Sequence, residues 1–290
     1  MTRHLLAMLA VAVLSGSALA QTVRDVPYGE GERNRLDLYL PEGVSAPPLV
    51  VFVHGGRWFR NDRSQVALYG RVERLTGAGI AIAIASIDYT YSTEAPWPAP
   101  REDLARAFAF LRENGATYGY DAARIAVWGQ SSGAHLALWA ALDQMVAGPE
   151  GIDAVVSWYA PSDLFALAAD RAADDVPDRP GLDTGPSPEA RLIGAPLREN
   201  RALADAASPL HALGALAADR ALPPALLVHG TADAIVSPRQ TERLHAAMQA
   251  RPGARVTLRR VEGAGHGGEG FDAEVPPAVA FLKAAFEDAD

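Results

Sequence analysis

The stretch Ile125-Ala126-Val127-Trp128-Gly129-Gln130-Ser131-Ser132-Gly133-Ala134 decides the fold. An apolar run of strand length leads into Gly129-Gln130-Ser131-Ser132-Gly133, which fits the pattern G-x-S-x-G, and helical spacing follows over 134–145. Glycines on both sides of a serine in this context predict a very tight strand-to-helix turn, because side chains there would clash. The following helix N-terminus favours negative charge beside the turn. The stretch therefore predicts Ser131 as a nucleophile, whereas Ser132 is offset by one from the pattern.

Outward from this turn, apolar runs alternate with segments of helical spacing. The run 35–40 alternates apolar and polar residues, which predicts an edge or hairpin strand with one wet face. Uninterrupted apolar runs are typical of parallel strands covered on both faces. The expected central strands are 49–53, 80–85, 125–128, 154–158, 225–228 and 256–261, with helices over 101–112 and 238–250 among others. The sequence therefore predicts an α/β fold with a mainly parallel central sheet flanked by helices.

One segment departs from this alternation. Residues from about 170 to 221 are rich in Ala, Asp, Arg and Pro, carry turn signals at 178–181 and 183–186, and show no clear strand pattern. Insertions of this length in compact domains are often functional. We expect a cap or long loop here, inserted into a single domain that spans 21–290.

Composition sets the broad class of protein. Hydrophobic residues make up 49% and charged residues 21% of the 290, as in a globular domain. The formal charge of -9 excludes an electrostatic footprint for nucleic acid. The chain has no Cys, which excludes thiolate chemistry, disulfides and Cys-ligated metals.

The first twenty residues are typical of an export signal. A short polar start precedes the apolar run 5–14, and Ala18-Leu19-Ala20 is a small-x-small cleavage site. The apolar run is shorter than the roughly 20 residues that span a bilayer. We expect residues 1–20 to be a signal peptide, no membrane span in the mature chain, and a periplasmic or extracellular location.

A serine hydroxyl needs a base, and the base needs a carboxylate that orients it. His266 lies in a glycine-rich loop directly after the run 256–261, and Asp233 follows the run 225–228. Both positions follow parallel strands, where open α/β sheets place their sites. The order Ser131, Asp233, His266 is the order that this kind of fold uses. We expect these three residues to be catalytic.

Other residues compete for these roles. Asp163, in Pro161-Ser162-Asp163-Leu164, is the rival acid, although it would also suit a helix N-cap. Among the other histidines, His135 is expected to pack under the turn, His229 to hydrogen-bond the Asp233 loop, and His211 and His245 to lie on the surface or cap.

A third element of the site is His54-Gly55-Gly56-Arg57-Trp58, at the end of the run 49–53. Acyl transfer passes through a tetrahedral oxyanion that needs fixed donors, and a glycine-rich loop can aim backbone N–H groups at it. We expect an oxyanion hole from the N–H groups of Gly56, Arg57 and Ser132. Trp58 is expected to wall the acyl pocket. The Arg57 cation would favour acidic alcohol groups such as uronates or carboxylated aromatics.

As a set, these residues resemble the α/β-hydrolase superfamily, and within it exported carboxylesterases related to acetyl-xylan and feruloyl esterases and to hormone-sensitive-lipase-like enzymes. The resemblance spans about 35–281 and includes Asp88-Tyr89 and the segments 121–129, 158–164 and 207–210. It implies that Ser131, Asp233 and His266 are nucleophile, acid and base. Arg57 stands where the family often has a third glycine, and Gly133-Ala134 where it often has Gly-Gly.

The resulting expectation is a serine hydrolase that cleaves short-acyl carboxylic esters of small molecules or carbohydrates, without cofactor or metal. The same triad serves an amidase, an arylformamidase or a peptidase, so these alternatives stay open. A binding protein that kept the fold and lost the chemistry is the alternative from another class.

Overall fold

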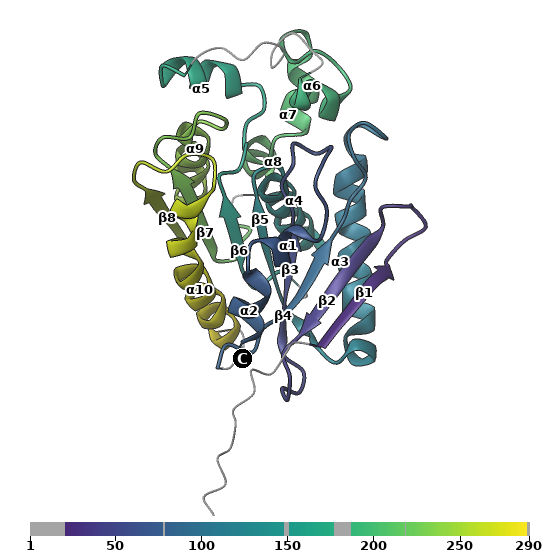
Figure 1. Ribbon diagram of the computed structural model, residues 1–290. Helices are drawn as coiled ribbons and strands as arrows, with labels where there is room; N and C mark the ends of the chain where they lie inside the picture. Colours follow the sequence, from purple (N-terminus) through teal and green to yellow (C-terminus); the bar gives the residue numbers. More distant parts are fainter. Residues whose placement is uncertain (1–20, 78, 148–150, 177–186, 218, 289–290) are drawn as a thin grey trace, which may run out of the picture.

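The computed structural model describes residues 21–77, 79–147, 151–176, 187–217 and 219–288 (Figure 1). The expected signal peptide, 1–20, and the part of the expected cap at 177–186 lie outside the described residues. The strands are β1 (Gln21–Pro27), β2 (Arg35–Leu40), β3 (Pro48–Val53), β4 (Ala83–Ile87), β5 (Asp121–Gln130), β6 (Val155–Trp158), β7 (Ala225–Gly230) and β8 (Val256–Val261).

Helices connect these strands and form the cap. The α-helices are α1 (Gln65–Leu68), α2 (Arg71–Thr76), α3 (Ala99–Tyr118), α4 (Ser132–Ala147), α5 (Leu167–Ala173), α6 (Pro188–Ile193), α7 (Arg201–Ala206), α8 (Pro209–Ala215), α9 (Pro238–Gln249) and α10 (Val275–Asp288). Two 3₁₀ turns are η1 (Leu197–Glu199) and η2 (Glu269–Glu274).

All eight strands form one sheet in the order β1-β2-β4-β3-β5-β6-β7-β8. The pairs β1–β2 and β2–β4 are antiparallel, and the other neighbouring pairs are parallel. This is the α/β-hydrolase architecture, so the predicted fold class is confirmed. β5, which carries the serine turn, lies near the middle of the sheet.

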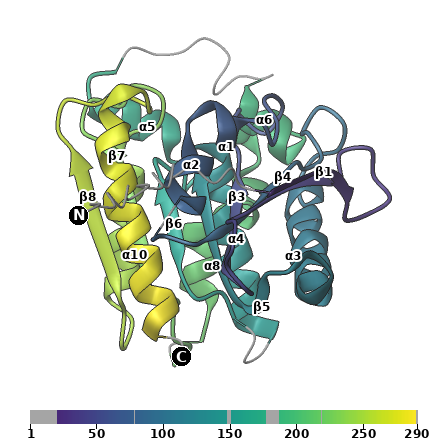
Figure 2. The same ribbon diagram turned by 60° about the horizontal axis from the view of Figure 1, so that its bottom comes forward.

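Helices cover both faces of the sheet and create two cores. Along β3, Val51 and Val53 join the core beneath α3, α4 and α9, whereas Val50 and Phe52 join the core beneath α2 and α10. Figure 2 shows α10 and α2 together on one side of the strands. This two-sided burial explains why the central strands are continuously apolar.

The prediction for 35–40 was partly wrong. β2 pairs in a hairpin with β1 as expected, but it also pairs with β4, so β1 is the edge strand on this side of the sheet. The other edge is β8, which was expected among the central strands and has no fully buried residue. Five of the six residues of β2 are buried, and Asp37, expected on a wet face, is 3% exposed. The Arg63 guanidinium pairs with the Asp37 carboxylate at 2.9 Å, which lets a charge lie inside the sheet.

The strand expected over 80–85 begins later, as β4. Ala81 has a φ of 59°, in the left-handed region, and this conformation does not continue a strand. Ile82 is nevertheless buried in the core beside α2.

Between β6 and β7 the described residues form α5 to α8 and η1, with no strand among them. In Figure 1 the helices α5, α6 and α7 lie beyond the ends of β5, β6 and β7. They therefore form a cap at the edge where the parallel strands finish. No helix in the described part of the chain combines the length and apolar character that crossing a bilayer requires.

Candidate active site

The serine turn is a tight link between β5 and α4. Ser131 has a φ of 56°, and its backbone N–H donates to the Trp158 carbonyl of β6 at 2.9 Å. A Cβ on Gly129 would lie 2.2 Å from the Gly133 carbonyl oxygen, and a Cβ on Gly133 would lie 2.1 Å from the Val53 carbonyl oxygen. Only glycine fits at either position, which is the physical basis of the G-x-S-x-G pattern.

Two loops at the next strands bring an acid and a base to this turn. Asp233 follows β7, and His266 follows β8. The loops are tied together: the Ala232 N–H donates to the Ala264 carbonyl at 2.9 Å, and the Gly263 N–H donates to the Thr231 hydroxyl at 2.9 Å. This pairing fixes the separation of the two side chains.

The structure brings together the three residues that the sequence predicts. The Nε2 atom of His266 lies 2.8 Å from the Ser131 Oγ, and its Nδ1 atom lies 2.7 Å from the Asp233 Oδ2. A carboxylate at Nδ1 requires a proton on that nitrogen, which leaves Nε2 as an acceptor for the serine O–H. The arrangement can remove the serine proton when the hydroxyl attacks a carbonyl.

A second imidazole holds Asp233. The Nε2 atom of His229 lies 3.2 Å from the Asp233 Oδ2 and 2.9 Å from the Val236 carbonyl, so the predicted contact is confirmed. The Asp233 Oδ1 accepts the N–H groups of Ile235 and Val236 at 2.8 and 3.0 Å. Burial raises the pKa of Asp233, but the hydrogen bonds from His229 and His266 outweigh it and hold that pKa below its usual range.

Tyr159 packs against the imidazole of His266. The sequence predicted no function for this tyrosine. Its ring centroid lies 4.5 Å from that of His266, and its ring also lies edge-on to Phe271 at 4.8 Å. Tyr159 has a φ of 44°, in the left-handed region, so the chain turns immediately after the end of β6. The available signal was position, since Tyr159 follows a central strand where such sheets place their sites.

The loop 54–58 lies against the serine turn. A Cβ on Gly55 would lie 2.9 Å from the Gln130 carbonyl oxygen and 3.2 Å from the Ser131 Cβ. The Gly55 N–H donates to the Gln65 Oε1 at 2.8 Å, which occupies that donor. Gly56 has a φ of 129°, and a Cβ there would lie 1.9 Å from the Arg60 carbonyl oxygen.

The expected oxyanion donors belong to this loop and to the start of α4, which both adjoin the serine turn. The amide of Ser132 is the first of α4, so no carbonyl four residues earlier in the helix accepts its hydrogen. Arg57, which is half-buried, has a φ of 58° and follows Gly56 in the loop. The oxyanion role of Gly56, Arg57 and Ser132 stays a prediction, consistent with this position.

Trp58 lies beneath the loop and is 2% exposed. Its indole Nε1 donates to the His135 Nδ1 at 3.2 Å, and the His135 Nε2 lies 2.7 Å from the Ala207 carbonyl. Burial lowers the pKa of His135 to about 4, so this imidazole is neutral at pH 7. His135 packs under the turn as predicted. The observed contacts give Trp58 a packing role, and its contact with an acyl group stays a prediction.

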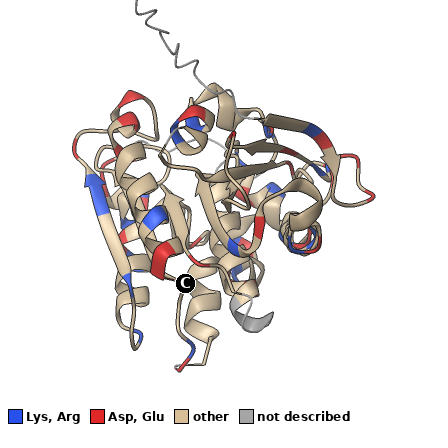
Figure 3. Ribbon diagram, turned by 90° about the horizontal axis from the view of Figure 1, so that it is seen from below, with Lys and Arg blue, Asp and Glu red and all other residues tan. Residues whose placement is uncertain are grey.

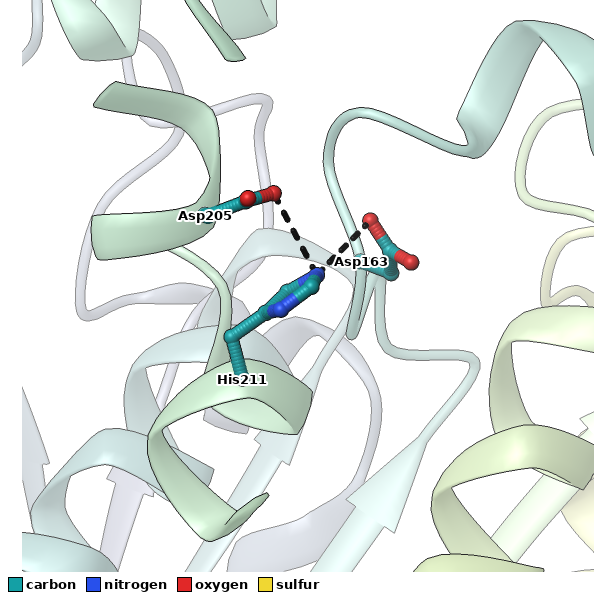
Figure 4. A group of neighbouring side chains, drawn as sticks. All are labelled: Asp163, Asp205 and His211. Atoms are coloured by element: carbon teal, nitrogen blue, oxygen red, sulfur yellow. Dashed lines mark ion pairs between the residues drawn. The ribbon is translucent and has the colours of Figure 1, made fainter. Parts of the chain in front are cut away.

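The rival acid Asp163 belongs to a different cluster (Figure 4). Its Oδ1 accepts the Ala166 N–H at 3.2 Å, in the turn that leads into α5, and lies 3.6 Å from the His211 Nε2. The same imidazole lies 3.3 Å from the Asp205 Oδ1 of α7. Among the side chains that the structure describes, this group of three could hold a metal ion by its spacing. The Asp163 carboxylate therefore contacts the turn before α5 and His211, whereas the carboxylate that contacts His266 is that of Asp233.

The chain is similar to known proteins in sequence and in fold. The family model BD-FAE matches residues 36–248, which is most of the chain. The esterase LipQ of Mycobacterium tuberculosis is 33% identical over 256 residues, covering 85% of this chain and 57% of LipQ. The rice protein named probable isoprenylcysteine alpha-carbonyl methylesterase ICMEL1 is 41% identical over 128 residues, covering 44% of this chain and 29% of that protein.

A solved structure extends the similarity over almost the whole fold. A truncated carbohydrate esterase from gut microbiota superposes with a TM-score of 0.80 at 27% identity, covering 94% of this chain and 99% of that one. The chain spans less than two thirds of the length of the curated relatives above. From the extent of the family match and the shared architecture, the chain belongs to the BD-FAE family of α/β-hydrolase esterases.

Proposed function

We propose that this chain is a serine carboxylesterase that cleaves small ester substrates through an acyl-enzyme intermediate. The hydrogen-bonded sequence Ser131–His266–Asp233, with distances of 2.8 and 2.7 Å, is the observation that carries the proposal. In acylation, the Ser131 Oγ attacks the ester carbonyl carbon and His266 Nε2 takes the serine proton. The imidazolium that forms is stabilised by the Asp233 carboxylate.

The tetrahedral intermediate carries a negative oxygen, which the N–H groups of Gly56, Arg57 and Ser132 would stabilise. When it collapses, the bond to the alcohol oxygen breaks, and His266 gives its proton to the leaving alcohol. Water then attacks the acyl-serine ester with His266 again as base, releasing the carboxylic acid and restoring Ser131. Every step uses groups of this chain, so the proposal includes no cofactor or metal.

For the substrate we propose a short acyl group on a carbohydrate or comparable alcohol. The helices α5, α6 and α7 lie beyond the end of β5, which Ser131 immediately follows (Figure 1), and we expect them to limit the length of the acyl chain. The similarity to a carbohydrate esterase supports an alcohol of that kind. The proposal is restricted to esters because the relatives in the comparison bear esterase names.

The test is kcat/KM for p-nitrophenyl acetate, butyrate, octanoate and palmitate, with Ser131→Ala as the control. We expect the shorter esters to be preferred and Ser131→Ala to lose at least about 10³-fold in kcat. Values that rise through octanoate would contradict the short-acyl proposal, because each accommodated methylene is worth about 1 kcal/mol or more. If an aryl formamide were cleaved faster than its matched ester, the proposed substrate would be an amide and not an ester.

A further inference from the structure

The hydrogen-bond contacts that begin at Ser131 continue beyond Asp233. The Asp233 Oδ2 lies 2.7 Å from the His266 Nδ1 and 3.2 Å from the Nε2 of His229, a residue of β7. The Nδ1 of His229 in turn lies 2.5 Å from the Oγ1 of Thr241, a residue of α9. Five side chains therefore form one continuous series of contacts, and its last two members lie outside the predicted catalytic three.

These last two members are buried. His229 and Thr241 are each 2% exposed. All six residues of β7 are buried, and the strand pairs with β6 on one side and β8 on the other, so the sheet fixes the backbone that carries His229. Asp233 and His266, by contrast, lie in the loops that follow β7 and β8. The sheet therefore sets the position of one imidazole, whereas a loop sets the position of the other.

The contacts of His229 also fix its tautomer. Its Nε2 faces two acceptors, the Asp233 Oδ2 and, at 2.9 Å, the Val236 carbonyl oxygen, so Nε2 carries a hydrogen. In the neutral imidazole the lone pair then lies on Nδ1, which accepts the hydrogen of the Thr241 hydroxyl. The partner of one ring nitrogen decides which nitrogen is protonated. Thr241 therefore directs the Nε2–H of His229 toward Asp233.

This N–H gives the Asp233 carboxylate a donor that takes no part in the proposed proton transfer. The carboxylate Oδ1 accepts the N–H groups of Ile235 and Val236, and Oδ2 accepts from both imidazoles. During the proposed reaction His266 gains and loses a proton, so its bond to Oδ2 changes in strength. The bond from His229 does not change. A displacement of about 1 Å in a catalytic group can cost about 100-fold in rate, so a constant donor on Oδ2 helps to hold the base in place.

We propose that His229 is a positioning residue: its Nε2–H, fixed by Thr241, holds the Asp233 carboxylate in the orientation that the catalytic base needs. The inference rests on the proposed esterase function and adds two residues that act on the reaction through Asp233. Orientation of the base stabilises the transition state and leaves substrate binding unchanged. Loss of this positioning should therefore lower kcat and leave KM within about twofold of the wild type.

The test uses matched substitutions and kcat for p-nitrophenyl acetate. His229→Leu removes the donor, and His229→Gln supplies a side-chain N–H in its place. A hydrogen bond to a charged group is worth about 1.5–3 kcal/mol, so we expect His229→Leu to lose roughly 10- to 100-fold in kcat and Gln to recover most of it. Thr241→Val removes only the hydroxyl and should lose about 3- to 10-fold, which Thr241→Ser should restore. Thr76→Val removes a hydroxyl that donates to the Val72 carbonyl in α2 and should keep kcat.

A double-mutant cycle separates positioning from a general effect on structure. Asp233→Ala leaves no carboxylate to position, so adding His229→Leu to it should cost less than about twofold in kcat. A loss in that background as large as in the wild type would overturn the inference, as would a wild-type kcat for His229→Leu. If His229→Leu does not fold, the comparison of Thr241→Val with Thr241→Ser decides, and equal kcat values for that pair overturn the inference.

A second measurement needs no turnover. In the proton NMR spectrum of Ser131→Ala, the Nδ1–H of His266 should give a low-field resonance because it is bonded to a carboxylate. We expect Thr241→Val to shift or broaden this resonance and Thr76→Val to leave it unchanged. An identical resonance with and without Thr241→Val would contradict the inference. Failure of the wild type to cleave any ester would instead contradict the proposed function.

Discussion

The Asp233 carboxylate contacts two imidazoles and two backbone N–H groups of the site. One of its oxygens lies within hydrogen-bond distance of two imidazoles, His266 at 2.7 Å and His229 at 3.2 Å, and the other accepts two backbone N–H groups. The carboxyl group is fully buried, yet these donors hold its pKa below the usual range. It therefore stays ionised at neutral pH and holds the proton of His266 on Nδ1, which directs Nε2 to Ser131.

Replacing Asp233 by Asn tests this role. The amide would favour the imidazole tautomer with its proton on Nε2, so we expect kcat to fall by on the order of 10³ to 10⁴ with little change in fold. The matched variant is Asp163→Asn, whose carboxylate lies near His211 and not near His266. It should keep kcat and alter only stability. Steady-state kinetics and circular dichroism of both variants provide the check, and an exchange of the two outcomes would assign the acid to Asp163.

At the scale of elements, the strand-turn-helix unit of β5, Ser131 and α4 depends on two glycines that touch neighbouring backbone. The carbonyl of Val53 would lie 2.1 Å from a Cβ at Gly133, and backbone cannot yield as a flexible side chain can. Because Val53 ends β3, this contact also sets how closely α4 approaches the adjacent strand and the loop 54–58. Packing and catalytic geometry are therefore determined together.

We expect Gly133→Ala to displace the turn, with a loss of at least about tenfold in kcat/KM and a lower Tm, since overpacking costs about 1–3 kcal/mol or more. Gly214→Ala is the control because a Cβ at Gly214 meets nothing within 4 Å and the residue lies in α8. Alanine favours a helix over glycine by about 1 kcal/mol, so this variant should keep activity and gain slightly in Tm. A Gly133→Ala enzyme with wild-type kinetics would contradict the packing argument.

The elements that sequence reasoning predicts well are those with local causes. The apolar run 125–128, the two glycines and the helical spacing after them identify β5, the turn and α4 without reference to the rest of the chain. By contrast, Asp37 looks like a surface residue of an edge strand. Its burial depends on Arg63, which is distant in sequence and reaches it only in the folded sheet.

The same reasoning applies to the site. Ser131, Asp233 and His266 each follow a strand, so topology alone brings them to one edge of the sheet. The contact of His229 with Asp233 was also predictable because Asp233 is only four positions further along the chain. The burial of Arg171 could not be predicted, since it depends on how α5 docks on α9 through Asp170. The burial of Trp58 beneath the loop likewise depends on contacts with residues that are distant in sequence.

At the scale of the whole molecule, charged groups of both signs occur at the end of the sheet opposite the cap helices. Viewed from the end opposite the cap, acidic and basic residues are interspersed (Figure 3). At that end Asp153, just before β6, lines a cavity of about 260 Å³ together with Arg255. Burial raises the pKa of Asp153 to about 6, and its Oδ2 has no hydrogen-bond partner among the described residues.

This carboxyl gives stability a defined pH dependence. The folded protein binds the Asp153 proton more tightly than the unfolded chain, so its contribution is most favourable below the unfolded pKa of about 3.9 and is lost as the pH rises through about 6. Asp153→Asn should therefore raise the Tm by about 2–4 °C above pH 6 and leave it unchanged near pH 4.

Thermal unfolding of the wild type and Asp153→Asn across pH 4 to 8 provides the measurement. Asp288→Asn is the control, because the Asp288 carboxylate is exposed and its ion pair with Arg255 contributes little. A Tm difference between wild type and Asp153→Asn that is the same at every pH would contradict the assignment of the effect to this ionisation.

We propose above all that Ser131 is a nucleophile, held in place by the sheet, the turn and the two loops. The most direct measurement is labelling of the full-length protein with a fluorophosphonate, followed by peptide mass spectrometry. We expect one label per chain, on the peptide that contains Ser131, and no labelling of Ser131→Ala. A label on another residue, or equal labelling of Ser131→Ala, would contradict it.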